Sequence, residues 1–539
     1  METSKNDETE VFNKTNGVNK PKLTTGMIPI YYDETDESWK KADESNPNNQ
    51  WYDYSITAKK YANICTVSDT INSSKAYRTS KTETKIPTED MTTMFVWIPR
   101  YAYSINAGNY RTASTETIAQ TNANPNKKID VTFLVGTTNT GANGVTYAKD
   151  YDANSIKKGQ ATPKIVHPGF TFGNQELTGI WIGKFAVNGK NSLGEYVGNW
   201  NTTTVKIVEP DETTHVKILP NSISWRHTTV GEAEYQGMKM GTNGKYYGWD
   251  NVNTHLAKNV EWGVASYLSY SQYGEVPDMN AAATYSTTLK EYYDCYTGAG
   301  PVAEGSGIVY DTYTYPTNGY HTKLGKIAST TRNIYGVYDM SGGAWEWVAG
   351  YLDNKNSSLN TYGNSTSNTN VRYFENGELK SEYIPYWDKF ETSAEEKNGV
   401  ALATITTSDG NKTQAELWVA NATSIKWNDT RKRLTEATFD NMKNNKGTGI
   451  YEILEEPSFY GVRHNTNTNK YEFEDTDVTE ETASGGKGWN NDYSLIGHIN
   501  YVFAARGGEC RDKNQGALHS LISDSGAYYN FSSRVVLLP

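Results

Sequence analysis

The segment 336–348, Gly-Val-Tyr-Asp-Met-Ser-Gly-Gly-Ala-Trp-Glu-Trp-Val, constrains the fold of this chain more than any other stretch. Its paired glycines, Gly342 and Gly343, predict a break in the backbone, and the bulky residues after them predict a strand. Side chains two apart in a strand point to the same face, so Trp345 and Trp347 are expected to be buried together in a sizeable core. Glu346 is expected on the opposite side, hydrogen-bonded to neighbouring backbone.

Other segments predict the elements around this strand. Residues 534–538 predict a buried closing strand because four successive apolar residues need a core, and its expected partner is 95–98 or 180–185. The apolar spacing of 254–272 predicts a helix capped by Asn253 or Thr254, and 228–240 predicts a less regular one. Further strands are expected at 27–32, 51–54, 95–98 and 179–187, and loops with short hairpins over 105–160.

Together with Phe503-Ala-Ala-Arg-Gly-Gly508, these stretches resemble the formylglycine-generating-enzyme/sulfatase-modifying-factor version of the C-type lectin fold. More narrowly, the chain resembles pilin-like surface proteins of gut Firmicutes and the variable proteins of diversity-generating retroelements. The resemblance implies an α+β, loop-rich C-type lectin fold with a long insertion. It implies little about function, since one scaffold hosts both enzymes and binders. The remaining matching stretches, in the family's order, are 94–103, 167–172, 179–185 and 259–267.

The distribution of these motifs predicts four parts. Residues 1–26 are polar and are expected to form a stalk or linker. Residues 27–351 and 486–539 are expected to build the lectin-fold core. The motifs are absent from 352–485, which predicts an insertion or subdomain; it is expected to be structured because Trp387, Trp418 and Trp427 need burial. Strands are expected there at 400–405 and 415–420, and a helix at 433–443.

Composition restricts the partners and the setting of the chain. Its 539 residues carry a net charge of −11 and no basic patch, so a nucleic-acid partner is not expected. Hydrophobic residues make up 36%, yet 40 tyrosines and 14 tryptophans are present, which predicts an aromatic-rich core wrapped in polar loops. The sequence contains no signal peptide and no apolar run long enough to span a bilayer. An extracellular or cell-surface location is expected. The resemblance further implies a native form that is membrane-anchored or pilus-associated through an upstream hydrophobic segment.

The cysteines argue against the enzymatic reading. Cys65, Cys295 and Cys510 are far apart in the sequence and can form at most one disulfide. The resembled enzymes use a cysteine pair downstream of an Arg-Gly-Gly segment. Here Arg506–Gly508 is followed by Cys510 alone, so a non-catalytic protein is expected. No cofactor is expected, and calcium binding is left open because the Asp- and Asn-rich loops lack EF-hand spacing.

The stretch 509–533 mixes unlike side chains between a glycine pair and the closing strand. In the diversified relatives the corresponding stretch carries exposed, variable positions on a rigid frame, and this mixture indicates either such a face or an ordinary surface loop. Gly507, Gly508, Gly516 and Arg534 are expected to hold the frame. The candidate ligand-binding residues are Glu509, Cys510, Arg511, Lys513, His519, Ser523, Tyr528, Tyr529 and Phe531.

The sequence therefore favours an adhesin-like binding protein that recognises a protein or glycan ligand on another cell or host surface. Active diversification of the face is left open. Three alternatives remain: a phage receptor-binding component, an enzyme of the sulfatase-modifying type, and a structural pilin-like subunit.

Overall fold

The computed structural model describes most of residues 17–351 and separate segments beyond them. The described ranges are 17–45, 50–112, 114–151, 157–172, 175–201, 204, 206–250, 252–281, 283–285, 293–301, 318–351, 370–375, 378–383, 400–406, 412–418, 433–434, 446–449, 452–453, 462–465, 470–473, 486–495, 503–510, 516–523 and 527–538.

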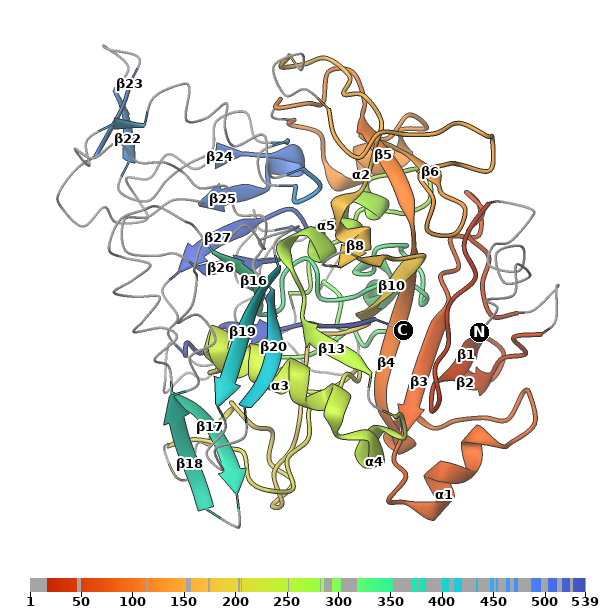
Figure 1. The fold of residues 1–539 in the computed structure, drawn as a ribbon, viewed down its shortest axis with the longest axis vertical. Helices are drawn as coiled ribbons and strands as arrows, with labels where there is room; N and C mark the ends of the chain where they lie inside the picture. Colours follow the sequence, from red (N-terminus) through yellow and green to blue (C-terminus); the bar gives the residue numbers. More distant parts are fainter. Residues whose placement is uncertain are drawn as a thin grey trace.

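The fold is mixed and sheet-rich, with few helices (Figure 1). Its largest sheet has seven strands, in the spatial order β13 (Asn253–Leu256), β29 (Val535–Leu538), β10 (Gly179–Gly183), β4 (Met91–Pro99), β3 (Asn63–Val67), β1 (Ile28–Asp33) and β2 (Ser38–Lys41). A second sheet has six strands, in the order β24 (Gly486–Lys487), β25 (Tyr493–Leu495), β27 (Ser520–Ser523), β26 (Phe503–Arg506), β16 (Trp345–Tyr351) and β28 (Phe531–Ser533).

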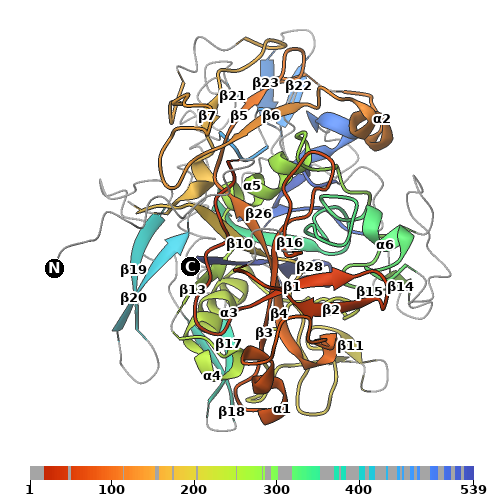
Figure 2. The same cartoon turned by 90° about the vertical axis from the view of Figure 1, so that its right-hand side faces the viewer.

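Smaller sheets and short helices surround these two. The sheet of β6 (Ile129–Phe133), β5 (Tyr101–Ile105) and β7 (Ile165–Val166) lies at one end of the molecule, and α3 and α4 lie at the other (Figures 1 and 2). The helices are α1 (Asn72–Lys75), α2 (Ile118–Ala123), α3 (Val230–Thr242), α4 (Gly244–Tyr247), α5 (Asn259–Ser269) and α6 (Lys323–Ile327). The hairpins and remaining strands are β8–β9 (Thr171–Phe172, Gln175–Glu176), β11–β12 (Trp200–Asn201, Lys206–Ile207), β14–β15 (Ala283–Tyr285, Tyr293–Cys295), β17–β18 (Asn370–Glu375, Glu378–Tyr383), β19–β20 (Val400–Thr406, Lys412–Trp418) and β21–β23 (Arg433–Leu434, Val462–Asn465, Lys470–Phe473).

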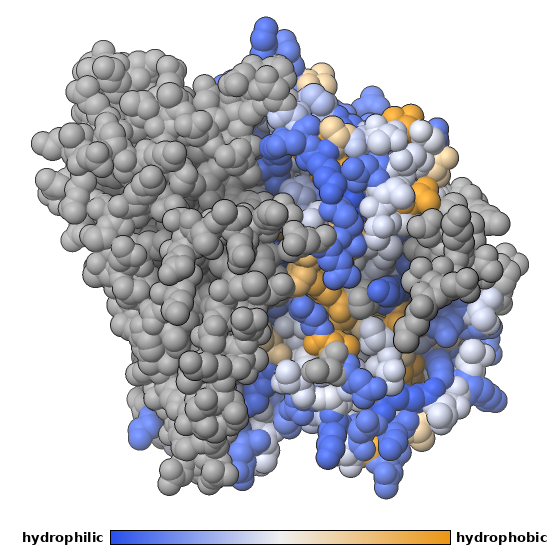
Figure 3. Space-filling model, viewed as in Figure 1, coloured by the Kyte–Doolittle hydropathy of each residue, from blue (hydrophilic) through white to orange (hydrophobic). Residues whose placement is uncertain are grey.

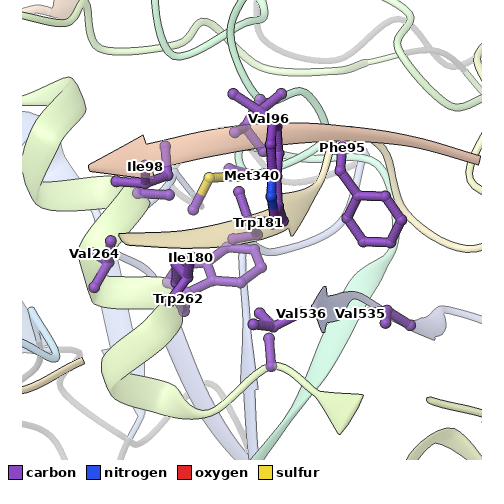
Figure 4. Packing of buried hydrophobic residues seen from close by; sticks show 14 of the residues in the cluster. Phe95, Val96, Ile98, Ile180, Trp181, Trp262, Val264, Met340, Val535 and Val536 are labelled. Carbon is purple, nitrogen blue, oxygen red and sulfur yellow. The ribbon is translucent and has the colours of Figure 1, made fainter. Parts of the chain in front are cut away.

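The closing strand is confirmed. β29 pairs antiparallel with β10, with Trp181 opposite Leu537 and Ile182 opposite Val536. On its other side β29 pairs with β13. All four residues of β29 are buried, and Figure 4 shows Val535 and Val536 beside side chains of β4, β10 and α5.

The helix predicted over 254–272 is only partly confirmed. Helix α5 begins at Asn259, and residues 253–256 form strand β13 instead. Thr254 and Leu256 pair with β29, so sheet pairing overrides the helical apolar spacing of this segment. The helix predicted over 228–240 is confirmed as α3, whose Thr229 and Glu232 form a reciprocal capping box. The strand predicted over 51–54 is wrong: that segment contributes only an isolated bridge between Asp53 and Lys60.

Two predicted boundaries also need correction. In the stalk predicted over 1–26, Val18 and Asn19 are buried, and the Asn19 side chain donates to the carbonyls of Gly136 and Thr178 at 3.0 and 2.8 Å. The N-terminal part of the packed body therefore includes residue 18, and residues 1–16 lie outside the described part.

The insertion predicted over 352–485 contains a segment that belongs to the core. Glu452 is buried, and its carboxylate accepts hydrogen bonds from the hydroxyls of Tyr103, Tyr151 and Tyr267 at 2.8, 2.8 and 2.5 Å. Strands β19 and β20 confirm the two predicted there as an antiparallel pair. In the predicted helix 433–443, residues 433–434 form strand β21, and the remainder lies outside the described residues.

Candidate functional site

The frame of the candidate face is organised by Arg534, between β28 and β29. Its fully buried guanidinium donates to the carbonyls of Gly183 and Tyr338 at 2.6 and 2.8 Å. It also donates to both carboxylate oxygens of Glu346, at 2.8 and 2.6 Å. Arg534 thus joins β10, the segment before β16, and β16 itself, which confirms its predicted role in holding the frame.

Glu346 differs from the prediction. Its carboxylate was expected to bond to neighbouring backbone, but it pairs instead with Arg534, which is 188 residues away in the sequence. The physical reason is that both groups are fully buried, where an ion pair that is completed by further hydrogen bonds offsets the cost of removing each charge from water. Burial raises the pKa of Glu346 to about 7, and Arg534 opposes that rise.

The two indoles of β16 are buried as predicted, and they bring two candidate site residues into the core with them. Strand β28 runs parallel to β16, with Phe531 opposite Trp345. The Phe531 ring stacks on Trp347 at a centroid distance of 4.4 Å, and the His519 ring lies 4.4 Å from Trp345. Phe531 and His519 are only 4% and 1% exposed, so their prediction as surface contacts is wrong. Both rings instead complete the aromatic layer around Trp345 and Trp347.

The exposed part of the candidate face is therefore smaller than expected. Tyr528 is 41% exposed, the highest exposure among the described candidate residues. Glu509 and Tyr529 are half-buried, and the Glu509 carboxylate accepts a hydrogen bond from the Asn530 amide at 3.0 Å. Arg511 and Lys513 lie outside the described residues, as does the side chain of Ser523, the last residue of β27.

The backbone beneath Tyr528 and Tyr529 is fixed by a segment that the sequence did not single out. The Arg226 guanidinium donates to the Tyr529 carbonyl at 3.0 Å and to the Asn199 side chain at 2.9 Å. The His227 amide donates to the Tyr528 carbonyl at 3.1 Å. No motif marked residues 226–227, because the contact joins positions about three hundred apart.

The glycines of the frame behave as predicted. Gly507 and Gly508 both adopt the left-handed region, with φ of +83° and +75°. At Gly516 the reason is space, because a Cβ there would lie 2.3 Å from a carboxylate oxygen of Asp492. The Asp492 carboxylate accepts from the Leu518 amide at 3.1 Å, so it secures the turn before β27.

Cys510 is not a surface residue, and the sequence argument about its isolation needs correction. It is 2% exposed, and its sulfur lies 3.8 Å from the sulfur of Cys295. The prediction considered only cysteines that follow Cys510, whereas the fold brings in one from 215 residues upstream. Burial raises the pKa of the Cys510 thiol, which disfavours the thiolate that a catalytic cysteine requires.

A separate pocket of about 200 Å³ lies between α3, α4 and the loop 210–216. Its walls include Trp225 and Tyr235, with the polar side chains of His215, Gln236 and Lys239. This mixture of aromatic faces and hydrogen-bonding groups suits a small polar ligand. In the sequence these residues carried no common motif.

Three further features of the described residues concern surface hydropathy, metal binding and membrane spanning. In the coloured part of the face in Figure 3, hydrophilic residues outnumber hydrophobic ones. Within the described ranges, no three His, Cys, Asp or Glu side chains gather closely enough to hold a metal ion. None of the helices described has the length and apolar character needed to cross a membrane.

The sequence was also compared with known proteins. No protein-family model matches it, and no curated protein matches it.

Proposed function

We propose that this chain is a secreted or cell-surface binding protein of the adhesin type, with a non-catalytic ligand face carried on a C-type lectin fold. The fold assignment rests on the sequence resemblance. It is supported by the closing strand β29, which pairs inside the sheet that also contains β1, β4 and β10. The ligand would be a protein or glycan on another cell, and a membrane or pilus anchor would lie upstream of the polar N-terminal residues.

The observation that carries this proposal is the exposed Tyr528 on a backbone that is fixed from below. Two hydrogen bonds from residues 226–227 fix the main chain at Tyr528 and Tyr529, and Phe531 anchors the following strand in the core. A tyrosine on a rigid support offers contact area at a low cost in conformational entropy, which suits a binding anchor. Glu509 and Asn530 supply polar groups beside it.

The test uses purified protein and intact cells of candidate hosts, with bound protein measured by flow cytometry. The variant Tyr528→Ser/Glu509→Ala is expected to lose at least tenfold in binding while its melting temperature stays unchanged. Ile56→Ser is the matched control, since it removes an exposed apolar side chain, 55% exposed, from the turn at 55–59. Equal binding by the wild type and both variants would reject the face.

A glycan ligand has its own arm in this experiment. Soluble monosaccharides are added as competitors, and Tyr235→Ala tests the pocket at α3. Competition that disappears in Tyr235→Ala would move the ligand site from the Tyr528 face to this pocket. Competition that depends on Tyr528 and Glu509 would keep the site at the face.

The formylglycine-generating alternative is disfavoured by the environment of its candidate cysteine. A nucleophilic cysteine needs access and a lowered pKa, whereas Cys510 is buried with a raised pKa. A cysteine-containing peptide incubated with the protein and oxygen is expected to remain unmodified by mass spectrometry. Aldehyde formation that is lost in Cys510→Ser would support the enzyme instead.

A further inference from the structure

Cys295 and Cys510 meet beneath the candidate face, although each comes from a different part of the chain. Cys295 ends strand β15, and Cys510 follows the Gly507–Gly508 turn after β26. Their sulfurs are 3.8 Å apart, and the side chains are 0% and 2% exposed. With Ala344 they form a small buried cluster, against which the half-buried Tyr529 packs.

Both cysteines contact the same carbonyl, that of Gly343, the second glycine of the pair before β16. The Cys510 amide donates to the Gly343 carbonyl at 2.8 Å, and the Cys295 thiol lies 3.3 Å from that same oxygen. Gly343 has a φ of +76°, in the left-handed region that glycine adopts without a Cβ penalty. The two cysteines therefore meet at a shared contact with the segment before β16.

We infer that Cys295 and Cys510 form an intrachain disulfide that links β15 to the turn after β26, within the cluster against which Tyr529 packs. The third cysteine is separate from this pair, since Cys65 is buried in the main core on β3, between β1 and β4. The inference does not depend on the proposed binding function, because it concerns only the covalent state of the chain.

The reaction can be balanced with a small-molecule disulfide as the oxidant. One cysteine, as its thiolate, attacks this oxidant, forms a mixed disulfide and releases one small thiol. The thiolate of the second cysteine then displaces the second small thiol and forms the Cys295–Cys510 bond. The two cysteine thiols lose two protons and two electrons, and the oxidant is reduced to two thiols.

Burial decides when this reaction takes place. A small-molecule disulfide must reach one sulfur in line, and neither sulfur is accessible in the folded structure. Burial also raises the pKa of the Cys510 thiol, so few thiolates are present at neutral pH. The bond is therefore expected to form while the chain is still folding, and only slowly once reduced protein has folded.

The first experiment counts thiols on full-length protein refolded with oxidised glutathione. After denaturation in acid, free thiols are alkylated and the peptides are mapped by mass spectrometry without reduction. One alkylated cysteine, Cys65, and a linked peptide pair containing Cys295 and Cys510 are expected. Three alkylated cysteines, a linked pair that includes Cys65, or disulfide-linked dimers would overturn the inference.

Variants and a reductant separate the crosslink from a merely structural effect of the side chains. Cys65→Ser is the matched control and is expected to keep the linked pair, whereas Cys295→Ser and Cys510→Ser lose it. Wild type and Cys65→Ser should show a lower melting temperature after reduction. Cys510→Ser should melt at the same temperature with and without the reductant. Because both sulfurs are buried, the reduction is carried out in denaturant before refolding. A wild type that then melts at the same temperature as the oxidised protein would contradict a closed disulfide.

Discussion

At the scale of single residues, Arg534 and Glu346 form an ion pair in which both side chains are buried. Both side chains are completely excluded from solvent. The Arg534 guanidinium donates to both Glu346 oxygens and to the carbonyls of Gly183 and Tyr338. Such a pair contributes little when it is intact and costs much when one partner is removed, because the other charge stays buried. It therefore specifies one arrangement of β10, β16 and β29.

We expect Glu346→Gln to lower the free energy of unfolding by about 3–5 kcal/mol, the usual cost of stranding a buried charge. Glu176→Gln is the matched control. Its partner Arg100 is also buried, but the Glu176 side chain is 22% exposed, and Arg100 retains three backbone carbonyls. That control should cost about 1 kcal/mol or less. Urea denaturation measures both, and equal losses would contradict this account of Glu346.

A pH dependence is expected from Asp492, whose pKa burial raises to about 7 against the opposing hydrogen bonds from Leu518 and Gly516. In the unfolded chain the pKa of Asp is about 3.9, so between pH 4 and 7 the folded state holds a proton that the unfolded state has lost. Stability therefore falls as the pH rises through this window.

Asp492→Asn removes this proton uptake. The free energy of unfolding of the variant, measured relative to wild type from pH 4 to 7, should increase steadily. Asp33→Asn is the control, because the hydrogen bond from Lys40 lowers the pKa of Asp33 to about 2 and leaves its charge unchanged in this range. Parallel curves for wild type and Asp492→Asn would show that the folded carboxyl titrates normally.

At the scale of elements, β16 and β28 form an aromatic layer that supports the candidate face from inside. Trp347 is fully buried, and its indole N–H donates to the Thr228 carbonyl at 2.9 Å. Trp347→Ala should destabilise by about 3–5 kcal/mol, since it empties a large aromatic site and removes this bond. Tyr528→Ser, on the exposed side, should change stability by less than about 0.5 kcal/mol. A small effect at Trp347 in thermal melts would exclude the layer from the core.

How much of these elements could be predicted depends on whether their signal is local. The run of Val535–Leu538 and the two tryptophans of β16 were predictable because several large apolar residues stand together. Phe531, His519 and Cys510 were placed on the surface because their neighbours in sequence are polar and unlike one another. Their burial depends on partners at Trp347, Trp345 and Cys295, and no local pattern encodes such distant contacts.

At the scale of the whole molecule, residues 446–449 and 452–453 contact the core although they lie inside a long stretch without family motifs. The Glu452 carboxylate accepts hydrogen bonds from the hydroxyls of Tyr103 in β5 and Tyr267 in α5. The Thr448 carbonyl accepts a hydrogen bond from Arg506 at 2.7 Å. The backbone also approaches α5 so closely that a Cβ on Gly263 would lie 1.6 Å from the Gly447 carbonyl oxygen. The predicted insertion is therefore not separable as one piece.

This arrangement predicts different results for two deletions. Replacing 354–445 by a flexible Gly/Ser linker of about 20 residues should leave the core folded. Extending the deletion through 453 should unfold it, because the hydroxyls of Tyr103, Tyr151 and Tyr267 lose the Glu452 carboxylate and Arg506 loses the Thr448 carbonyl. Circular dichroism and thermal melts compare the two. Unfolding of both proteins would make 354–445 part of the core, and folding of both would make the Glu452 contacts dispensable.

The position of β29 has a consequence for how the chain is made. The strand fills the place between β13 and β10, yet residue 538 leaves the ribosome after every other strand of both sheets. Until then, the edges of β10 and β13 that pair with β29 are unpaired, and the apolar site that β29 fills is open. Unpaired strand edges of this kind can pair with strands of other chains. Nascent chains stalled before residue 535 should therefore be sensitive to protease and prone to aggregate. Pairing of β29 with β10 and β13 would then complete the seven-stranded sheet.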